Sequence, residues 1–541
     1  MTGFRHASGD PGPSSNEGWP WPYPVREHAR GRPNQPALVD VGLGRSVTYG
    51  ELDELVEGMA ATVRPHVEDT LGILVDGGLA YATAFFAALR LDAAAVPLPV
   101  DATVPELAEH FDRLPVDAVV VRSSHRSVLT ASLEDRCSES VEFVDLTIED
   151  LGLGDRDSGD RGHGSLALVV PGGRSEPGAR EDPTADSRAI DPCCYLATSG
   201  TTGTPNVVTL TATNLLASAL GSAMRLGTGP TVRWLSPLPP WHMGGLAPMV
   251  RATVHGGTVV YQRPFDPDET IRTAREERVT GLSLVPVMLE GLLEAAWKPP
   301  DSLRFVLLGG AAAGPSLIER ARAAGIPVRP TYGATETSSQ VATATEADLA
   351  AEPSAVGRPL ALTSVTIVDE NDTPVEAGAT GEIVVDGPTV TPGYLDRDAW
   401  AARRSSHGFH TGDEGYLDGA GRLHVTGRID ARIVTGGEVV DPASVEATLR
   451  EHPSVADAGV AGVPDEEWGE IVGAVIVPGA FEGSVAAIEA FVTDRLASHR
   501  RPRLILASTS VPRTASGTVD RPAVRDQLRA AFDDVPAPDP D

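Results

Sequence analysis

The chain has 541 residues, of which 41% are hydrophobic, and its formal net charge is −31. One hydrophobic core rarely extends beyond about 250–300 residues, so this length predicts at least two domains. The acidic balance argues against nucleic-acid binding, which requires a basic face. The sequence has no apolar run of about 18 residues and no apolar signal-peptide core near its start. We therefore expect a cytoplasmic protein without a membrane span.

Short apolar runs alternate with helix-like segments between Pro36 and Gly333. Each run has the length of a buried strand and is bounded by Gly or Pro. The runs are residues 70–76, 117–121, 193–197, 257–262, 282–286, 305–310 and 328–333. One helix is expected to begin at Thr48, because Glu51 stands at the spacing of a capping box. This alternation predicts an α/β fold with largely parallel sheets.

The pattern changes after Gly333. A small β-rich subdomain is expected from the short strands 364–369, 381–387 and 421–427. An α/β pattern then returns, with helices near 442–452 and 486–497 and strands near 458–463 and 472–477. Residues 147–190, rich in Gly, Asp, Glu, Ser and Arg, are expected to form a mobile surface insertion.

Cysteine and lysine are both rare. The three cysteines, Cys137, Cys193 and Cys194, argue against a disulfide framework, and the last two are expected to be buried strand residues. Lys298 is the single lysine, so arginines supply the other basic residues. A strongly acidic chain of this kind is expected to tolerate molar salt, which screens self-repulsion. A GC-rich genome is the alternative explanation of the composition.

A loop rich in Gly and hydroxyl residues follows the predicted strand at 193–197. Its sequence is Thr198-Ser199-Gly200-Thr201-Thr202-Gly203-Thr204-Pro205. The backbone N–H groups and hydroxyls of such a loop can wrap phosphate oxygens. The loop lacks the G-K-[ST] ending of a Walker motif. It resembles the phosphate loop of adenylate-forming enzymes, which include acyl-CoA synthetases, peptide-synthetase adenylation domains and luciferases.

Other motifs of that superfamily follow in the family's order. They are Gly309-Gly310-Ala311-Ala312, Tyr332-Gly333-Ala334-Thr335-Glu336, Thr411-Gly412-Asp413, Gly427-Arg428-Ile429-Asp430 and Gly436-Gly437-Glu438. The resemblance implies that Glu336 holds Mg²⁺, that Tyr332 and the Gly309–Ala312 loop lie near adenine, and that Asp413 binds the ribose. It also implies that Arg428 contacts the nucleotide, that Asp430 is a hinge, and that the Gly436–Glu438 loop lines the pantetheine tunnel.

The resemblance also implies a domain layout and a reaction. We expect a flexible tail at 1–30, an ATP- and acid-binding domain at 31–429, a mobile α+β domain at 430–530 and an acidic tail at 531–541. With ATP, Mg²⁺ and coenzyme A, the enzyme would convert a small carboxylic acid to an acyl-adenylate and then to a thioester. Self-association is left open.

One position departs from the family pattern. The family's PxTxxGK motif supplies a lysine for the first step, but Thr518 stands at the lysine position here. Arg513 or Arg521 could supply the charge, although arginine differs from lysine in shape and reach. Mg²⁺ and solution cations could compensate instead. The third alternative is an adenylation-impaired homologue that retains only the second step.

The acid-binding residues are predicted from neighbouring strings. Trp241-His242-Met243-Gly244-Gly245-Leu246 lies where the family places its acid pocket, and Ser338-Ser339-Gln340 follows the metal-binding motif. Both strings are similar to ligases that act on o-succinylbenzoate in menaquinone biosynthesis. A second carboxylate on the substrate needs a cation or several donors. Arg251, Ser338 and Gln340 are candidates, beside His242 and Gly244. Another aromatic or fatty acid is the alternative substrate.

Overall fold

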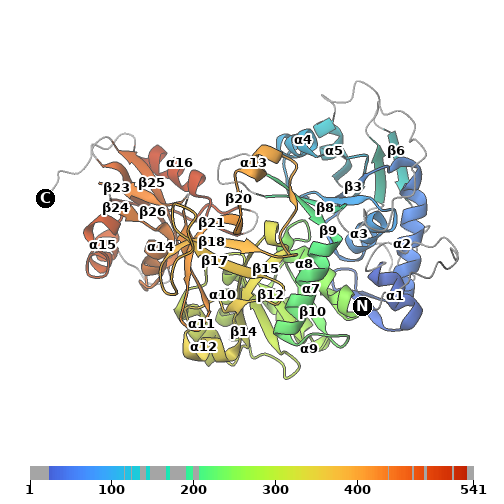
Figure 1. The fold of residues 1–541 in the computed structure, drawn as a ribbon, viewed down its shortest axis with the longest axis horizontal. Helices are drawn as coiled ribbons and strands as arrows, with labels where there is room; N and C mark the ends of the chain where they lie inside the picture. The colour runs from blue at the N-terminus through green and yellow to red at the C-terminus, as the bar shows by residue number, and fades with distance from the viewer. Residues whose placement is uncertain are drawn as a thin grey trace, which may run out of the picture. The chain divides into compact units, whose positions relative to one another are not determined.

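The protein has a mixed α/β architecture with a large N-terminal and a small C-terminal domain, which confirms the predicted fold class (Figure 1). The computed structural model describes residues 23–114, 116–122, 125–133, 142–146, 166–170, 191–198, 206–429, 431–436, 438–465, 468–479, 484–514 and 517–532. Within these residues, no helix has the length and hydrophobicity that crossing a membrane requires.

The backbone contacts divide the chain into two compact units. The first contains Met1–Val39, Gly44–Tyr195 and Thr209–Leu216, and the second contains Asp40–Leu43, Leu196–Val208 and Ala217–Asp541. The elements up to the second unit are α1 (Pro24–Gly31), β1 (Pro36–Asp40), β2 (Arg45–Thr48), α2 (Tyr49–Val63), η1 (Arg64–His66), β3 (Thr70–Leu74), α3 (Gly78–Arg90), β4 (Ala94–Pro97), α4 (Val104–Arg113), β5 (Ala118–Arg122), α5 (Arg126–Leu133), β6 (Glu142–Leu146), β7 (Leu166–Val170), β8 (Pro192–Ala197) and β9 (Val207–Thr211).

The first unit is built on a sheet in which β8, β4, β3, β5, β7 and β6 are neighbours in that order. β3 pairs parallel with β4 and β5, and all its residues are buried, as expected for a continuous apolar run. The capping box predicted at Thr48 is present, because its side chain accepts the Glu51 N–H while the Glu51 carboxylate accepts the Thr48 N–H. Cys193 and Cys194 are buried in β8, as predicted, and burial raises the pKa of the Cys193 thiol to about 12.

The range 147–190 differs from its prediction as a surface insertion. Within it, Leu166–Val170 form β7, which pairs antiparallel with β5 and β6, and Leu166 to Val169 are buried. The prediction was wrong for this strand, because the composition of the surrounding residues hid a short apolar run. The rest of the range lies outside the described residues.

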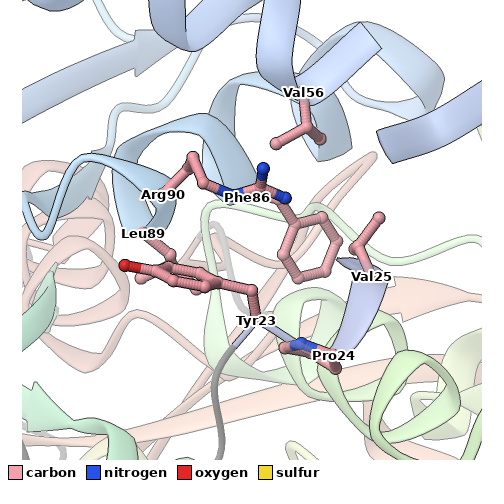
Figure 2. Close-up of a pocket in the computed structure, with 7 residues that line it drawn as sticks. All are labelled: Tyr23, Pro24, Val25, Val56, Phe86, Leu89 and Arg90. Carbon is pink, nitrogen blue, oxygen red and sulfur yellow. The ribbon is translucent and has the colours of Figure 1, made fainter. Parts of the chain in front are cut away.

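A small pocket of the first unit lies among α1, α2 and α3 (Figure 2). Its lining residues are Tyr23, Pro24, Val25, Val56, Phe86, Leu89 and Arg90. The Arg90 guanidinium is held by Asp53 Oδ1 at 2.5 Å and Glu57 Oε2 at 2.6 Å. None of the residues predicted to bind a nucleotide or an acid lines this pocket.

The second unit contains the larger part of the predicted motifs. Its elements before the C-terminal segment are α7 (Ala212–Leu226), β10 (Arg233–Ser236), α8 (Met243–His255), β11 (Thr258–Tyr261), α9 (Pro267–Glu276), β12 (Gly281–Leu284), α10 (Pro286–Glu294), β13 (Phe305–Leu308), α11 (Pro315–Ala323), β14 (Val328–Ala334), η3 (Thr335–Thr337), β15 (Ser339–Thr343), α12 (Glu346–Ala351), β16 (Arg358–Pro359), β17 (Ser364–Val368), β18 (Gly381–Asp386), β19 (Gly393–Tyr394), α13 (Arg397–Ala401), β20 (Arg404–Ser405), β21 (Gly408–Leu417) and β22 (Leu423–Arg428). Strands β11, β10, β12, β13 and β14 are neighbours in this order and parallel.

The β-rich subdomain predicted after Gly333 is present. β17, β18, β21 and β20 form an antiparallel sheet, and β22 pairs with β21. Its core includes Ile367, Ile383, Val385 and Phe409. This sheet carries the predicted ribose motif, Thr411–Asp413, on β21, and Gly427 and Arg428 of the next motif on β22.

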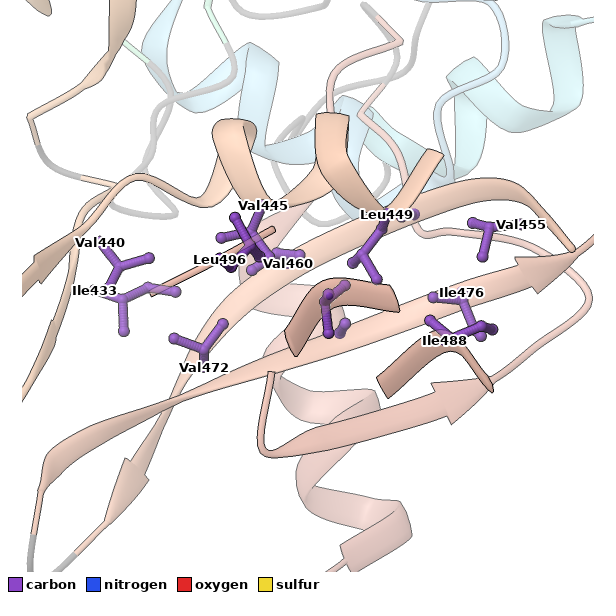
Figure 3. Packing of buried hydrophobic residues seen from close by; sticks show 13 residues of the cluster. Ile433, Val440, Val445, Leu449, Val455, Val460, Val472, Ile476, Ile488 and Leu496 are labelled. Atoms are coloured by element: carbon purple, nitrogen blue, oxygen red, sulfur yellow. The ribbon is translucent and has the colours of Figure 1, made fainter. Parts of the chain in front are cut away.

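The C-terminal segment has its own hydrophobic core (Figure 3). Its elements are β23 (Ile433–Thr435), β24 (Glu438–Val440), α14 (Pro442–Arg450), β25 (Val455–Asp465), β26 (Gly469–Pro478), α15 (Val485–Thr493), η4 (Ser498–Arg500), β27 (Leu504–Ala507) and α16 (Arg521–Phe532). Val445 and Leu449 of α14 pack with Val460 of β25, Ile476 of β26 and Ile488 of α15. The helices and strands predicted here are confirmed.

Candidate functional site

The predicted phosphate loop lies between β8 and β9. The carbonyl oxygen of Asn206 accepts hydrogen bonds from the backbone N–H of Thr198 at 2.8 Å and from its Oγ1 at 3.2 Å. These two bonds close the base of the loop. The predicted phosphate ligands Ser199, Gly200, Thr201, Thr202 and Gly203 lie outside the described residues. Their contact with phosphate stays a prediction.

Two predicted nucleotide-binding residues converge on the carboxylate of a third, Asp413. Tyr332 Oη donates a hydrogen bond of 2.6 Å to Asp413 Oδ2, and Arg428 Nη1 lies 3.3 Å from Asp413 Oδ1. The pairing of β21 with β22 places Asp413 opposite Arg428. Gly412 has a φ of +74°, and a Cβ there would lie 2.7 Å from Arg403 Nη1 and 3.2 Å from Arg428 Nη2. The absence of a side chain at Gly412 therefore lets two guanidinium groups lie beside this residue, which precedes Asp413 in the chain.

Glu336, the predicted metal ligand, is held on both its side chain and its backbone. Tyr394 Oη donates to Glu336 Oε1 at 2.8 Å, and the Thr391 N–H donates to the Glu336 carbonyl at 2.7 Å. In the described part of the chain, no three acidic, His or Cys side chains are grouped as metal ligands. Mg²⁺ needs only one or two protein carboxylates when phosphate oxygens complete its shell. Glu336 fits a metal ion that arrives with the nucleotide.

Burial and the neighbouring carboxylates keep both tyrosines protonated. Burial, followed by the charge of Asp413, raises the pKa of Tyr332 well above its usual value. Burial, followed by the charge of Glu336, raises the pKa of Tyr394 in the same way, and Arg403 and Arg428 oppose this shift. The two phenols therefore act as hydrogen-bond donors that orient the carboxylates.

The predicted adenine loop follows β13. Gly309, Gly310 and Ala311 lie at the end of this strand, beside β14, where Leu308 pairs with Pro330 in parallel register. A Cβ at Gly333 would lie 1.6 Å from the Ser339 carbonyl oxygen, so this position requires glycine. Thr335 begins η3, and its carbonyl accepts the Ser338 N–H at 3.0 Å. The order of the parallel strands thus gathers the Gly309 and Tyr332 motifs at one edge of the sheet.

Two predicted acid-binding residues are joined through a residue that the sequence did not indicate. Arg251 of α8 is buried, and its Nη2 donates to Ser218 Oγ at 3.2 Å. Ser218 Oγ in turn donates to the Ser338 carbonyl at 2.6 Å. Burial alone lowers the pKa of Arg251 to about 9, and none of the described carboxylates forms an ion pair with it. Its Nε is buried without a hydrogen-bond partner.

The other acid-pocket candidates lie on α8 and β15. His242 is the N-cap residue of α8, and Gly244 is in its first turn. Gln340 is buried in β15, where its Nε2 donates to Thr343 Oγ1 at 2.7 Å and its Oε1 has no hydrogen-bond partner among the described residues. Gln340 and Arg251 therefore each keep a buried polar atom for an additional partner.

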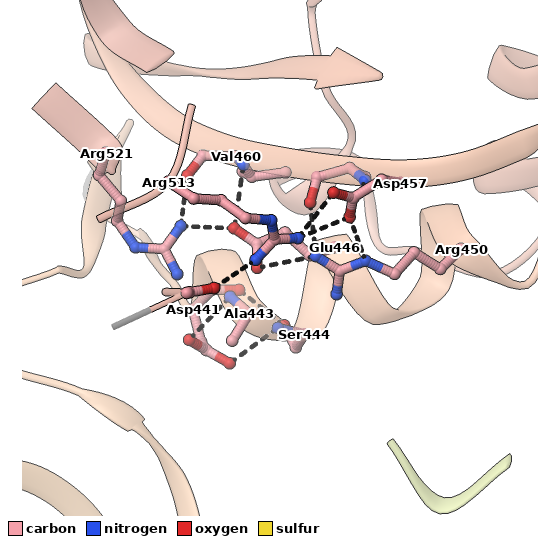
Figure 4. A network of polar contacts seen from close by, with 11 residues as sticks. Asp441, Ala443, Ser444, Glu446, Arg450, Asp457, Val460, Arg513 and Arg521 are labelled. Atoms are coloured by element: carbon pink, nitrogen blue, oxygen red, sulfur yellow. Dashed lines mark hydrogen bonds and ion pairs between the residues drawn. The ribbon is translucent and has the colours of Figure 1, made fainter. Parts of the chain in front are cut away.

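The arginines considered as replacements for the missing lysine are engaged elsewhere (Figure 4). Arg513 Nη2 lies 2.8 and 2.7 Å from the two carboxylate oxygens of Asp457, and Arg521 Nη1 lies 2.5 Å from Glu446 Oε1. Thr518 Oγ1 is 2.6 Å from Thr514 Oγ1. In this structure both arginines are therefore engaged with carboxylates of the C-terminal segment, and the alternative in which one of them supplies the charge stays a prediction.

The remaining C-terminal candidates are described only in part. Asp430 and Gly437 lie outside the described residues. Gly436 has a φ of +57°, and a Cβ there would lie 2.7 Å from Trp468 Cε3. The hinge and the pantetheine tunnel stay predictions.

Sequence analysis missed Ser218, Tyr394 and Arg403. None belongs to a predicted motif, and the three lie on different parts of the fold: α7, β19 and the segment between α13 and β20. No sequence pattern indicates that a hydroxyl is a buried hydrogen-bond donor or that a guanidinium lacks an ion pair. Only the packing of these elements reveals them.

Comparison with known families matches one family model to the large N-terminal domain and another to the small C-terminal domain. Residues 25–395 match the family model described as AMP-binding enzyme, and residues 444–518 match that of the AMP-binding enzyme C-terminal domain. The first match covers more than half of the chain and contains the phosphate loop and the Tyr332 motif.

Similar proteins agree with these models. The chain is 40% identical over 332 residues to a 2-succinylbenzoate–CoA ligase from Bacillus licheniformis, covering 61% of this chain and 69% of the relative. It is 37% identical over 366 residues to the enzyme of that name from Bacillus cereus, covering 67% of this chain and 74% of the relative. The solved structure of o-succinylbenzoate CoA synthetase from Bacillus subtilis with the acyl-adenylate intermediate OSB-AMP is similar, with a TM-score of 0.79, 30% identity and coverage of 94% and 98%. The structure of that synthetase with ATP and magnesium has the same TM-score and 29% identity, covering 94% of this chain and 100% of that one.

Proposed function

The chain belongs to the AMP-binding enzyme family, and we propose that it is an ATP-dependent ligase that converts o-succinylbenzoate to o-succinylbenzoyl-CoA in menaquinone biosynthesis. The superfamily inferred from the motifs is confirmed. Relatives that carry this activity in their names support the choice of acid.

The buried guanidinium of Arg251 is the observation that carries this choice of substrate. A buried cation without a carboxylate partner is unfavourable until an anion binds it. O-succinylbenzoate has two carboxylates, so one can react while the other pairs with a cation. Arg251 donates to Ser218 Oγ, Ser218 Oγ donates to the Ser338 carbonyl, and Gln340 of β15 has a buried Oε1 without a hydrogen-bond partner among the described residues. A fatty acid has no second carboxylate and would leave Arg251 unpaired.

The first step joins the acid to the nucleotide. One carboxylate oxygen of the acid attacks the α-phosphorus of ATP, a new O–P bond forms, and the bond to the β-phosphate breaks with release of pyrophosphate. Asp413, oriented by Tyr332, would hold the ribose hydroxyls, and Arg428 would lie beside the phosphates. Magnesium held near Glu336 would neutralise phosphate charge.

The second step transfers the acyl group. The coenzyme A sulfur attacks the acyl carbon, a C–S bond forms, the bond to AMP breaks, and the thiol proton passes to solvent. We expect the C-terminal domain to rotate at Asp430 between the steps, which places the loop at Gly436 beside the pantetheine arm.

A second function is favoured by the neutral side chain of Thr518. An adenylation-impaired homologue would make a thioester only from an acyl-adenylate that another enzyme supplies. The ion pairs of Arg513 and Arg521 with Asp457 and Glu446 are consistent with this alternative, because they leave no arginine free next to Thr518.

The test supplies the purified protein with ATP, Mg²⁺, coenzyme A and o-succinylbenzoate, in low and in molar KCl, and measures AMP and thioester by mass spectrometry. We expect both products. Product from other acids of a panel, but not from o-succinylbenzoate, would assign a different acyl-CoA ligase. Thioester from supplied o-succinylbenzoyl-adenylate alone would establish the second function.

A further inference from the structure

The first step brings two anions together, so it needs positive charge beside the α-phosphate. The attacking carboxylate and the triphosphate repel each other, and fixed cations in a site that excludes water reduce this repulsion strongly. Thr518 is neutral wherever the C-terminal domain is placed, and Arg513 and Arg521 are ion-paired. The positive charge would therefore have to come from a cation of the large domain that forms no ion pair with a carboxylate.

Arg403 is such a cation. It lies between α13 and β20, and its backbone is fixed, because its N–H donates to the Trp400 carbonyl at 2.9 Å and its carbonyl accepts the His410 N–H at 2.8 Å. None of the described carboxylates forms an ion pair with its guanidinium. The next residue differs: Arg404 Nη1 lies 3.6 Å from Asp386 Oδ1, and its guanidinium lies 5.8 Å from the centre of the Trp400 ring.

The guanidinium of Arg403 lies among the residues of the nucleotide site. The Cβ position of Gly412 is within 2.7 Å of Arg403 Nη1 and 3.2 Å of Arg428 Nη2, so two cations reach the same point next to Asp413. Arg428 is balanced by Asp413, whereas Arg403 is not. Both arginines also act electrostatically on Tyr394, whose hydroxyl donates to Glu336 Oε1.

This arrangement indicates an anionic ligand. Two like charges that share one point are unfavourable unless an anion lies between or beside them. Arg428 pairs with Asp413, the expected ribose carboxylate, and both arginines act on Tyr394, which donates to Glu336, the expected metal carboxylate. In ATP, the α-phosphate joins the ribose to the metal-bound phosphates. A guanidinium also matches phosphate oxygens with two parallel donors.

We propose that Arg403 is a catalytic residue of the adenylation step, in which it contacts the α-phosphate and supplies the positive charge that Thr518 cannot supply. This inference rests on the proposed function, since it assigns a role within the first half-reaction. The second half-reaction, in which a neutral thiol attacks a formed acyl-adenylate, does not need Arg403.

The experiment compares Arg403→Ala with the matched control Arg404→Ala, and measures each half-reaction separately. Acyl-adenylate formation is followed by o-succinylbenzoate-dependent exchange of labelled pyrophosphate into ATP, and thioester formation is followed from supplied o-succinylbenzoyl-adenylate and coenzyme A. We expect Arg403→Ala to lower the exchange rate by about 100- to 1,000-fold, as for the loss of one donor to a transition-state oxyanion. Thioester formation should stay within about threefold, and Arg404→Ala should resemble the unmodified protein in both assays.

A second variant protects the test against misfolding. Thr518→Lys introduced into Arg403→Ala should recover at least about tenfold of the exchange rate, because the new ammonium supplies the missing charge. A misfolded variant would show no such recovery and would lose thioester formation as well.

The outcomes separate this inference from the proposed function. If the unmodified protein catalyses exchange and Arg403→Ala does so equally well, the inference is overturned and the ligase function stands. If Arg403→Ala loses both half-reactions in parallel and Thr518→Lys restores neither, Arg403 is structural and the inference is likewise overturned. If the unmodified protein catalyses no exchange with any acid, the proposed function fails and the inference fails with it.

Discussion

The hydroxyl of Tyr332 donates a 2.6 Å hydrogen bond to Asp413, although 81 residues separate the two in the chain. This bond fixes the carboxylate that is expected to hold the ribose. Tyr332→Phe should raise the KM for ATP by about 10- to 100-fold, which corresponds to one hydrogen bond to a charged group. Steady-state AMP release at varied ATP measures the change. Tyr416→Phe, on the same sheet, is the control, and equal KM values for the two variants would refute the positioning role.

The ion pair of Arg513 and Asp457 should hold the segment that carries Thr518. Arg513→Ala and Asp457→Ala should each lower the unfolding free energy by about 1 kcal/mol, because the pair is partly exposed but has two contacts. The exchanged pair, Arg513→Asp with Asp457→Arg, should recover part of the loss. Urea unfolding of the unmodified protein, the two Ala variants and the variant that combines both Ala substitutions forms a double-mutant cycle, and additive losses would show that the two side chains do not interact.

Thr518→Lys tests whether the protein lacks a cation in its first step. Because Arg403 is expected to supply that charge already, the single substitution should change pyrophosphate exchange by less than about tenfold, a small part of the effect of one transition-state donor. A rise of several orders of magnitude would instead mean that the natural site is impaired. The measurement is the exchange rate at saturating ATP and o-succinylbenzoate.

Arg251→Met should separate stability from substrate binding. Replacing a buried, uncompensated cation by an apolar side chain should stabilise the free protein by about 1–4 kcal/mol. The KM for o-succinylbenzoate should rise by about 100-fold, as for loss of a buried charge pair, and the KM for ATP should not change. Arg272→Met, on the exposed face of α9, should leave all three quantities unchanged. Unaltered o-succinylbenzoate KM in Arg251→Met would argue against this pocket.

Molar salt should preserve the fold and the activity. The net charge of −31 produces self-repulsion that salt screens, so the thermal midpoint should rise between about 0.1 and 2 M KCl, where the Debye length falls from about 10 Å to below 3 Å. Thermal unfolding and AMP release are measured across this range. Activity that disappears as the salt concentration rises would support a compositional origin of the acidic residues.

Much of the fold follows from local sequence. β3 is a continuous apolar run, and α2 begins at Thr48, whose capping box is formed by residues three positions apart. Such patterns act over a few neighbouring residues, so one sequence contains them. β7 was missed, because its five apolar residues lie within a polar stretch, and only pairing with β5 and β6 shows that they form a strand.

The sequence by itself also determined the chemical class of the site. The motifs at Thr198, Glu336, Asp413 and Arg428 identify an adenylate-forming enzyme, since each string is short and contiguous. The same reading showed that Thr518 replaces a cation, but it left open which residue compensates.

Only the tertiary structure decided which arginines pair with a carboxylate and which do not. It engages Arg513 with Asp457 and buries Arg251 next to Ser218. It also places Arg403 close to Arg428, where none of the described carboxylates pairs with it. The sequence alone does not distinguish these three arginines, because it does not show their surroundings. Its burial and its nearest carboxylate depend on elements that are distant in the chain, and these decide whether the charge stabilises the fold or is available to a ligand.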